Sequence, residues 1–333
     1  MKTFKESELK TFEQLAMLRQ GSLKQILASF LKKHYKQVVH TKDYIFAVGD
    51  IPVALVAHLD TVFKNPPTDI FFDQKKNVLW APNGLGADDR AGVFAIVQIV
   101  RAGYKPHIIF TTDEEIGGHG ASKLALLDCP FKELKYIIEL DRRGSNDCVF
   151  YDCENQEFVE YVEQFGFEYN FGSYTDICEF CPAWGIAGVN LSIGYKDEHS
   201  TSETLFVGQM LSTIEKVKKM LADAAHIEEA FIYIPSKTAY HYTYGYDWYD
   251  YRPRVLKCTS CQKYLMEEEL FPVVMLDKDT KFFCPDCLVN DKIAWCNQCS
   301  SAYQKAVAAE SDTGICPKCV ELKEKKANVT KAN

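Results

Sequence analysis

Two adjacent glutamates mark the stretch of this sequence that is best suited to chemistry. Glu114 and Glu115 follow the apolar run 107–110, which we expect to be a buried strand, and precede a glycine-rich loop. Because successive side chains leave an extended chain on opposite sides, the two carboxylates can take different tasks. One can bind a metal cation while its neighbour moves protons on a nearby water molecule. Taken alone, such a pair is more often a solvated acidic turn.

The other candidate residues share a position just beyond a predicted strand or in the loop that follows one. They are His58, Asp60, Asp88, Asp141 and His199. Asp60 has the spacing to orient the imidazole of His58 through a hydrogen bond. Asp88 lies in a glycine-rich turn before the predicted helix 91–102, where a carboxylate could equally cap the helix. With Asp89 beside it, one aspartate could serve each purpose, and we expect Arg90 to help hold this loop.

Imidazoles and carboxylates without cysteine favour zinc or a similar divalent cation at a catalytic site. We expect His58 and Asp141 on one cation, Glu115 and His199 on a second, and Asp88 shared between them. Two such cations activate a water molecule and stabilise both the nucleophile and the developing oxyanion. The first glutamate of the acidic pair is then free to act as general base and to pass the proton to a leaving amine. The predicted reaction is hydrolysis of an amide.

Predicted strands alternate with predicted helices through most of the chain. Two helices with a break at residues 21–22 are expected over residues 7–35, hairpins over 37–48 and 71–80, and a closing helix over 205–225. This alternation predicts an α/β fold, with a mixed, mostly parallel sheet flanked by helices. The candidate residues would then lie along one edge of that sheet.

In this order, the motifs resemble those of the co-catalytic di-zinc aminopeptidase and carboxypeptidase clan, which includes peptidase T-like and leucyl aminopeptidase-like zinc exopeptidases. The resemblance spans about residues 50–225. It rests on His58-Leu59-Asp60, residues 86–92 (Gly-Ala-Asp-Asp-Arg-Ala-Gly), residues 113–117 (Asp-Glu-Glu-Ile-Gly), Leu140-Asp141 and the segment around His199. It implies the zinc exopeptidase fold and the roles already described, with Glu114 as general base and Asp60 supporting His58.

The spacing of the last two motifs departs from many dimeric relatives, which carry a separate lid domain there. Asp141 and His199 are only 58 positions apart, too few for an inserted domain of roughly 100 residues. The sequence therefore predicts a lid-less form, without a catalytic histidine from a lid. Tyr174, Tyr195 and Asp176 are candidate substitutes for oxyanion or substrate contacts, although core or helix-capping roles are commoner for such residues.

Eight of the 13 cysteines follow residue 255 and form four Cys-x-x-Cys pairs. The pairs are Cys258 with Cys261, Cys284 with Cys287, Cys296 with Cys299, and Cys316 with Cys319. Each pair can place two thiolates on one metal, and two pairs complete a closed tetrahedral site. We expect sequential pairing into two structural zinc ribbons, with cross-braced pairing as the alternative. Four earlier cysteines, Cys148, Cys153, Cys178 and Cys181, fit buried thiols better than a further metal site.

The sequence predicts four regions. They are a catalytic domain at 1–230, a tyrosine-rich connecting strap at 231–255, tandem zinc ribbons at 256–322 and a disordered lysine-rich tail at 323–333. The ribbons would serve as a module that contacts a protein partner or presents substrate.

The charge distribution argues against a nucleic-acid partner. The chain has a net charge of −8, and the region 257–333 has eleven lysines against eleven acidic residues. A surface without positive excess is a poor match to a polyanion. The charged N-terminus lacks the apolar core of an export signal, and no apolar run is long enough to span a bilayer, so we expect a cytoplasmic protein.

The leading hypothesis is a metal-dependent aminopeptidase that acts on short peptides, with two catalytic zinc ions (or another divalent metal) and two structural zinc ions. An N-acyl amino acid deacylase or a carboxypeptidase is an alternative, because the same metal core cleaves any suitable amide. An adaptor with an inactive peptidase-like scaffold is a third possibility. Against the adaptor, every expected ligand position and the general base are present.

Overall fold

The computed structural model describes residues 2–236, 255–261, 263–266, 270–275, 280–290, 293–296, 302–304, 316 and 319–320. The chain divides into two compact units, Met1–His241 and Tyr242–Asn333. Among the described helices, none has the length and apolar composition needed to cross a membrane.

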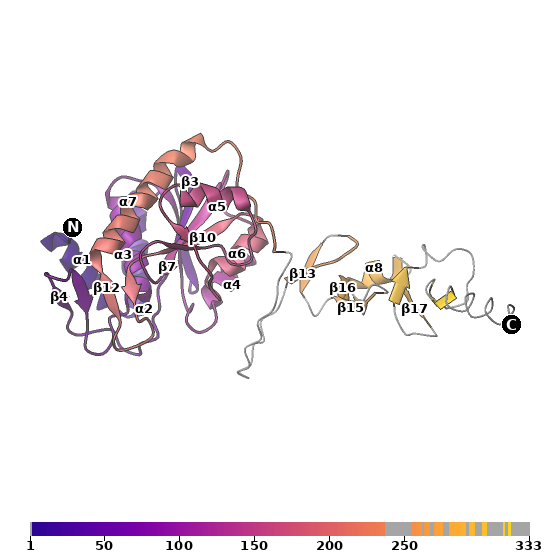
Figure 1. Cartoon of the computed structure of the whole chain (residues 1–333), viewed down its shortest axis with the longest axis horizontal. Coiled ribbons are helices and arrows are strands. Elements are labelled where there is room, and N and C mark those ends of the chain that lie inside the picture. The colour runs from indigo at the N-terminus through magenta and orange to yellow at the C-terminus, as the bar shows by residue number, and fades with distance from the viewer. Residues whose placement is uncertain are drawn as a thin grey trace, which may run out of the picture. The chain divides into compact units, whose positions relative to one another are not determined.

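The first unit is built on an eight-stranded sheet with the order β1-β2-β6-β3-β7-β10-β8-β9 (Figure 1). The strands are β1 Gln37–His40, β2 Tyr44–Val48, β3 Ile51–His58, β6 Pro106–Thr111, β7 Tyr136–Arg142, β8 Asp147–Val149, β9 Glu168–Tyr169 and β10 Gly188–Ser192. The central strands β6, β3, β7 and β10 are parallel, whereas β2 and β8 pair antiparallel at their flanks. The predicted α/β fold with a mixed, mostly parallel sheet is confirmed.

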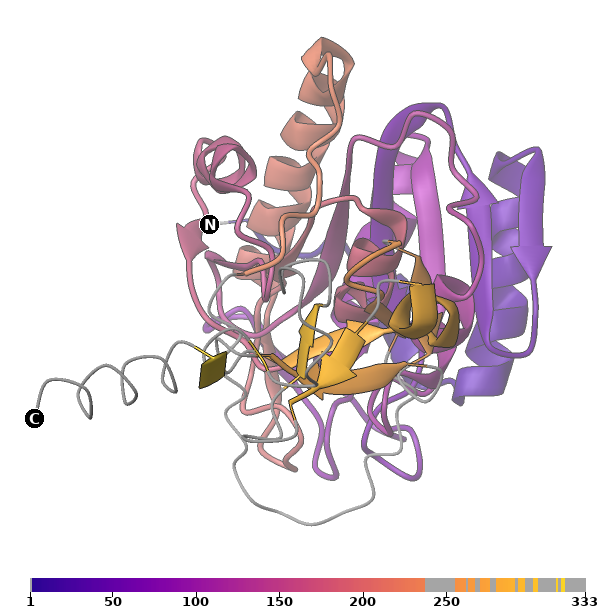
Figure 2. The same cartoon turned by 90° about the vertical axis from the view of Figure 1, so that its right-hand side faces the viewer.

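Helices cover both faces of this sheet. They are α1 Glu6–Ala16, α2 Gln20–His34, α3 Ala87–Arg101, α4 His119–Ala125, α5 Gln156–Glu163, α6 Ile177–Trp184 and α7 Val207–Asp223, with a 3-10 turn η1 at Ala224–His226. Helices α3 and α7 lie on one face of the sheet, and α4 and α6 lie on the other (Figure 1). Side chains of α3 and α7 belong to one core, and those of α4 and α6 belong to a second. The long helix α7 is plain in both views (Figure 2).

Strand β3 shows why the sheet needs both layers of helices. Leu55 and Ala57 belong to the core on the α3 side, while Ala54 and Val56 belong to the core on the α4 side. All four are fully buried. A strand buried on both faces has a continuous apolar run in place of alternation, which is the pattern of residues 53–57.

A second, four-stranded sheet joins two distant parts of the chain. Its order is β11-β12-β5-β4, with β4 Phe71–Asp73, β5 Val78–Trp80, β11 Tyr195–Lys196 and β12 Thr204–Phe206. The loop between β11 and β12 contains His199. Because β12 pairs with β5, this loop is brought to the segment that runs from β5 into α3.

Three local expectations were wrong. The break between the first two helices lies after Ala16 and before Gln20. Gly21 lies instead inside the first turn of α2, where the backbone N–H groups have no partner within the helix. Asp141 lies within β7, not beyond its end. The closing helix begins at Val207, because the preceding three residues extend the second sheet as β12.

Residues 231–236 still pair with the first unit. Isolated bridges join Ile232 to Ile186 and Pro235 to Cys153. The other described part of the predicted strap is residue 255, which begins β13. Residues 237–254 and the predicted tail at 323–333 lie outside the described residues.

The described residues of the second unit include short antiparallel strand pairs and the short helix α8. The strands are β13 Val255–Lys257, β14 Tyr264–Met266, β15 Phe271–Val274, β16 Thr280–Phe283, β17 Ile293–Trp295 and β18 Ala302–Gln304, and the helix is α8 Pro285–Asn290. β13 pairs with β14, β15 with β16, and β17 with β18.

Candidate metal centre

Five predicted ligands come together at the carboxyl edge of the central strands. They form two groups, His58 with Asp88 and Asp141, and Asp88 with Glu115 and His199, and within each group the candidate ligand atoms lie within 4.8 Å of one another. Asp88 is common to both. Its Oδ1 lies 3.0 Å from His58 Nε2, and its Oδ2 lies 3.2 Å from His199 Nε2. The two oxygens of one carboxylate therefore face two different groups.

The remaining contacts complete each group. Asp141 Oδ1 lies 3.5 Å from His58 Nε2, and Glu115 Oε2 lies 3.0 Å from His199 Nε2. Structure and sequence thus divide the residues into the same two sets. In this structure the Nε2 atoms of His58 and His199 contact carboxylate oxygens directly. Each Nε2 could face a bound cation in place of that contact.

Asp60 joins the histidine to the acidic loop. Its Oδ1 lies 3.2 Å from His58 Nδ1, so the ring can present Nε2 to the metal groups. The same carboxylate accepts the backbone N–H groups of Glu114 and Glu115, at 3.0 and 3.1 Å. The Asp60 side chain therefore orients the His58 ring and also holds the backbone at the start of the loop that carries both glutamates.

Asp141 is held by hydrogen bonds from neighbouring elements. Its backbone N–H donates to Asn190 Oδ1 at 2.9 Å, and the Asn190 amide donates to the Asp141 carbonyl at 2.8 Å. Tyr195 donates its hydroxyl to Asp141 Oδ1 and Thr175 donates to Oδ2, at 3.0 and 3.1 Å. These hydrogen bonds fix the carboxylate beside His58 and satisfy its oxygen atoms.

Asp88 and Asp89, at the start of α3, divide the two tasks considered from the sequence. Asp88 contacts His58 and His199, whereas Asp89 Oδ1 accepts the Gly92 N–H at 2.9 Å, as a helix-capping side chain does. The buried Arg90 donates to the carbonyl oxygens of Leu59, at 2.6 Å, and Leu18, at 3.1 Å. It therefore holds the chain after β3 against the turn between α1 and α2.

The electrostatics of the centre fit a bound cation. Burial, assisted by the charge of other carboxylates, raises the pKa of Glu114 to about 9, that of Glu115 to about 7 and that of Asp141 to about 6. The hydrogen bond to Asp88 raises the pKa of His199 to about 9, against the opposing effect of burial. Glu115 Oε1 is buried and has no hydrogen-bond partner. The cluster has an excess of negative charge, and divalent cations would compensate it.

Glu203 is a residue of this centre that the sequence did not reveal. It is 1% exposed, and its carboxylate accepts the backbone N–H groups of Gly86, at 2.6 Å, and Asp88, at 3.0 Å. It lies four residues after His199, in a segment where Ser, Thr and Glu look like an ordinary solvated loop. Only the second sheet, which joins β12 to β5, brings it to the turn that carries Asp88.

Replacing Glu203 with glutamine is expected to loosen this turn. The amide keeps one acceptor oxygen, so one of two buried N–H groups loses its partner, at a cost of about 1–3 kcal/mol in the free energy of unfolding. Urea unfolding of the full chain measures the loss, and hydrogen exchange over residues 84–90 locates it. The exposed Glu163→Gln on α5 is the control. Unchanged exchange over 84–90 would contradict this positioning role.

The three residues predicted to contact substrate lie differently from that expectation. Tyr195 and Asp176 are buried, at 3% and 0% exposure, and their polar atoms contact Asp141 and Thr111. Tyr174 is half-buried and donates its hydroxyl to Glu179 at 3.0 Å. Fully buried side chains cannot contact a substrate, so we assign Tyr195 and Asp176 to the support of the centre. Asp176 occupies the N-cap position of α6, but its side chain makes no capping hydrogen bond.

The tail cysteines form two further groups within the described residues of the second unit. The first cysteine group is Cys258, Cys261, Cys284 and Cys287, and the second cysteine group is Cys296, Cys316 and Cys319. Cys299, the predicted partner of Cys296, lies outside the described residues. Cys148, Cys153, Cys178 and Cys181 belong to no such group.

Comparison with known proteins bears on the fold. No protein-family model matches the sequence, and no curated protein does. The structure is similar to aminopeptidase PepT from Bacillus cereus (TM-score 0.53, 14% identity, 66% of this chain and 98% of that one). It is also similar to a tripeptidase from Staphylococcus aureus (TM-score 0.53, 13% identity, 66% of this chain and 98% of that one). A third similar structure is the TET aminopeptidase of a Thaumarchaeota archaeon (TM-score 0.51, 14% identity, 65% of this chain and 97% of that one). This chain has the fold of these peptidases.

Proposed function

We propose that residues 1–230 form a lid-less, two-metal amide hydrolase, an aminopeptidase that acts on short peptides. The observation that carries the proposal is the position of Asp88, whose two oxygens face His58 and His199 in separate groups. A carboxylate shared by two sets of ligands is the arrangement that a pair of cations requires. The similar structures are those of aminopeptidases and a tripeptidase, and this supports peptides as the substrate of this chain.

The residues that would hold the cations are those of the two groups. His58 and Asp141 would bind one, Glu115 and His199 the other, and Asp88 both. When bound, zinc or a similar divalent ion would make a water molecule a nucleophile at neutral pH and stabilise the charge that develops on the amide oxygen. Oxygen and nitrogen donors with no cysteine fit this chemistry.

Glu114 is the residue best placed to move the proton. Among the described residues, its carboxylate accepts no hydrogen bond and it is in neither metal group, while its backbone N–H is held by Asp60. It would accept a proton from the attacking water and return it to the leaving amine nitrogen. Burial raises its pKa to about 9. The positive charge of the two cations would lower that pKa, so that the carboxylate can accept the proton at neutral pH.

A substrate screen tests the exopeptidase assignment. We expect the full chain with zinc to hydrolyse dipeptides and tripeptides that have a free amino terminus, and to lose at least about tenfold in kcat/KM when that terminus is acetylated. The comparison uses one dipeptide in free, N-acetylated and C-amidated forms. The released amino acid is measured in each case.

The other outcomes identify the alternatives. Preference for the N-acetylated form would indicate an N-acyl amino acid deacylase, and loss of activity on C-amidation alone would indicate a carboxypeptidase. No hydrolysis of any of these amides by the metal-loaded chain would favour the adaptor, in which the peptidase fold is only a scaffold.

A further inference from the structure

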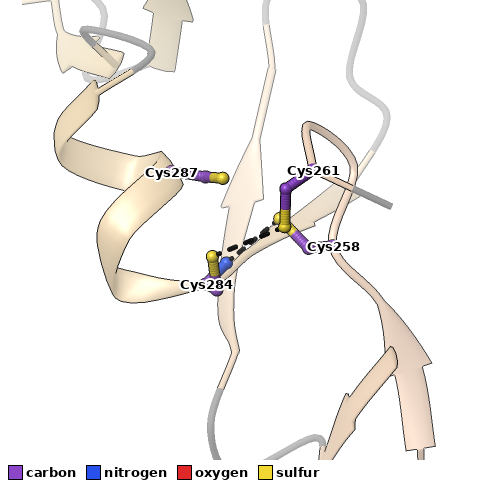
Figure 3. Close-up of side chains that lie close together, drawn as sticks. All are labelled: Cys258, Cys261, Cys284 and Cys287. Atoms are coloured by element: carbon purple, nitrogen blue, oxygen red, sulfur yellow. Dashed lines mark hydrogen bonds between the residues drawn. The ribbon is translucent and has the colours of Figure 1, made fainter. Parts of the chain in front are cut away.

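The first cysteine group places four sulfur atoms around one point in the second unit. Cys258 and Cys261 come from the turn between β13 and β14, and Cys284 and Cys287 come from the end of β16 and the first turn of α8. Figure 3 shows the four side chains directed toward a common space. Cys261 and Cys284, which are 23 positions apart in the chain, therefore meet at one site.

The spacing of the sulfurs fits a metal and not disulfides. All four cysteines are free, and their sulfur atoms lie within 4.8 Å of one another. Cys261 Sγ and Cys284 Sγ are 3.9 Å apart, whereas bonded sulfurs lie about 2.05 Å apart. Four thiolates at about 2.3 Å from a tetrahedral zinc ion are separated by about 3.8 Å along each edge. The observed separation matches that edge.

The backbone also supports thiolate at this site. The Cys284 N–H donates to Cys258 Sγ at 3.4 Å, which favours the negatively charged form of the sulfur (Figure 3). The Thr259 N–H donates to the Phe282 carbonyl at 2.7 Å, so the two turns are joined next to the cysteines. Both halves of the site are thus held together by main-chain hydrogen bonds.

The apolar core around this group is small. Its buried members are Cys258, Leu270, Val273, Phe283, Cys284 and Cys287, so half of the described core consists of the cysteines themselves. Among the described residues of this unit, so few buried apolar side chains supply little hydrophobic stabilisation. A bound metal commonly provides the missing folding free energy in such small domains.

We propose that Cys258, Cys261, Cys284 and Cys287 bind one zinc ion in a closed tetrahedral site, and that the fold of residues 255–290 depends on it. Four protein ligands leave no open position for water or substrate, so the ion has a structural role. The site is independent of the proposed peptidase centre, whose ligands are oxygen and nitrogen atoms.

The test is the double variant Cys284→Ala/Cys287→Ala in the full chain, with Cys129→Ala as the matched control. Cys129 is a free cysteine of the first unit and belongs to no described metal group. Elemental analysis of the purified proteins should show one zinc ion per chain fewer in the double variant than in the control. Trypsin cleavage after Lys257 and Lys263, located by mass spectrometry, should accelerate at least about tenfold, because this region loses its fold.

Two results would overturn the proposal. Equal zinc content in the double variant and the control would show that these thiols bind no zinc, and equal rates of cleavage would show that the fold does not depend on it. Iron in place of zinc in the control protein would refute the choice of metal.

A second measurement on the unsubstituted chain covers the case in which the double variant does not accumulate. Titration with a mercurial thiol reagent, in the presence of a chromophoric chelator, should release zinc in step with modification of the tail cysteines. Mass spectrometry identifies the modified residues. Modification of all four cysteines without zinc release would refute the site.

Discussion

Replacement of Glu114 by glutamine is expected to lower kcat for peptide hydrolysis by about 10³-fold, in the middle of the range for loss of a general base. The substitution removes the proton acceptor but leaves every residue of the two metal groups in place. Metal content should therefore stay at the level of the unsubstituted chain. A loss of this size corresponds to about 4 kcal/mol of transition-state stabilisation.

The measurement combines steady-state kinetics with elemental analysis of the same sample. Glu157→Gln, an exposed glutamate on α5, is the matched control and should retain full activity. If Glu114→Gln retained more than about a tenth of the activity, another group would have to carry the proton and the assignment would fail. If it lost metal as well, Glu114 would be a ligand and not a base.

Replacement of Asp88 by alanine is expected to remove both exchangeable cations and with them all measurable hydrolysis. Its Oδ1 faces His58 and its Oδ2 faces His199, so one substitution takes a donor from each group. His199→Ala removes a donor from the second group only, and should leave one cation bound. Calorimetric titration of zinc into chelator-treated protein gives the number of sites for each variant.

The exposed Asp69→Ala controls for the loss of a carboxylate elsewhere in the first unit. The zinc ion that we propose for the first cysteine group would provide an internal reference, because these thiolates are absent from the centre at the sheet edge. Two sites remaining in Asp88→Ala would show that Asp88 is not a ligand, and one remaining site would show that it is not shared.

Much of the first unit could be predicted from the sequence, because the signals are local. The continuous apolar run of β3 indicates a strand buried on both faces, and glycine-rich turns indicate where strands end. The candidate residues of the centre are distinguished in the sequence by their type and by their position after such runs. The parallel strands β6, β3 and β7 then bring those positions to a common edge, as parallel strands must.

Other features depended on contacts that no local pattern reveals. Glu203 looks solvated in the sequence, and Tyr195 looked available to a substrate, yet both side chains are buried beside the centre. Their environment follows from the pairing of β12 with β5, which joins segments more than 120 residues apart.

By itself, the sequence determined the α/β class, the residues suited to bind cations, and the division of the tail into Cys-x-x-Cys pairs. Only the tertiary structure decided which side chains support the centre, Glu203 and Tyr195 among them, and which of the two possible cysteine pairings the first two pairs adopt. The physical reason is one of range. Periodicity and spacing encode what each segment can bury or bind, whereas a binding site is a set of distances between segments, and those distances exist only after the sheets have paired.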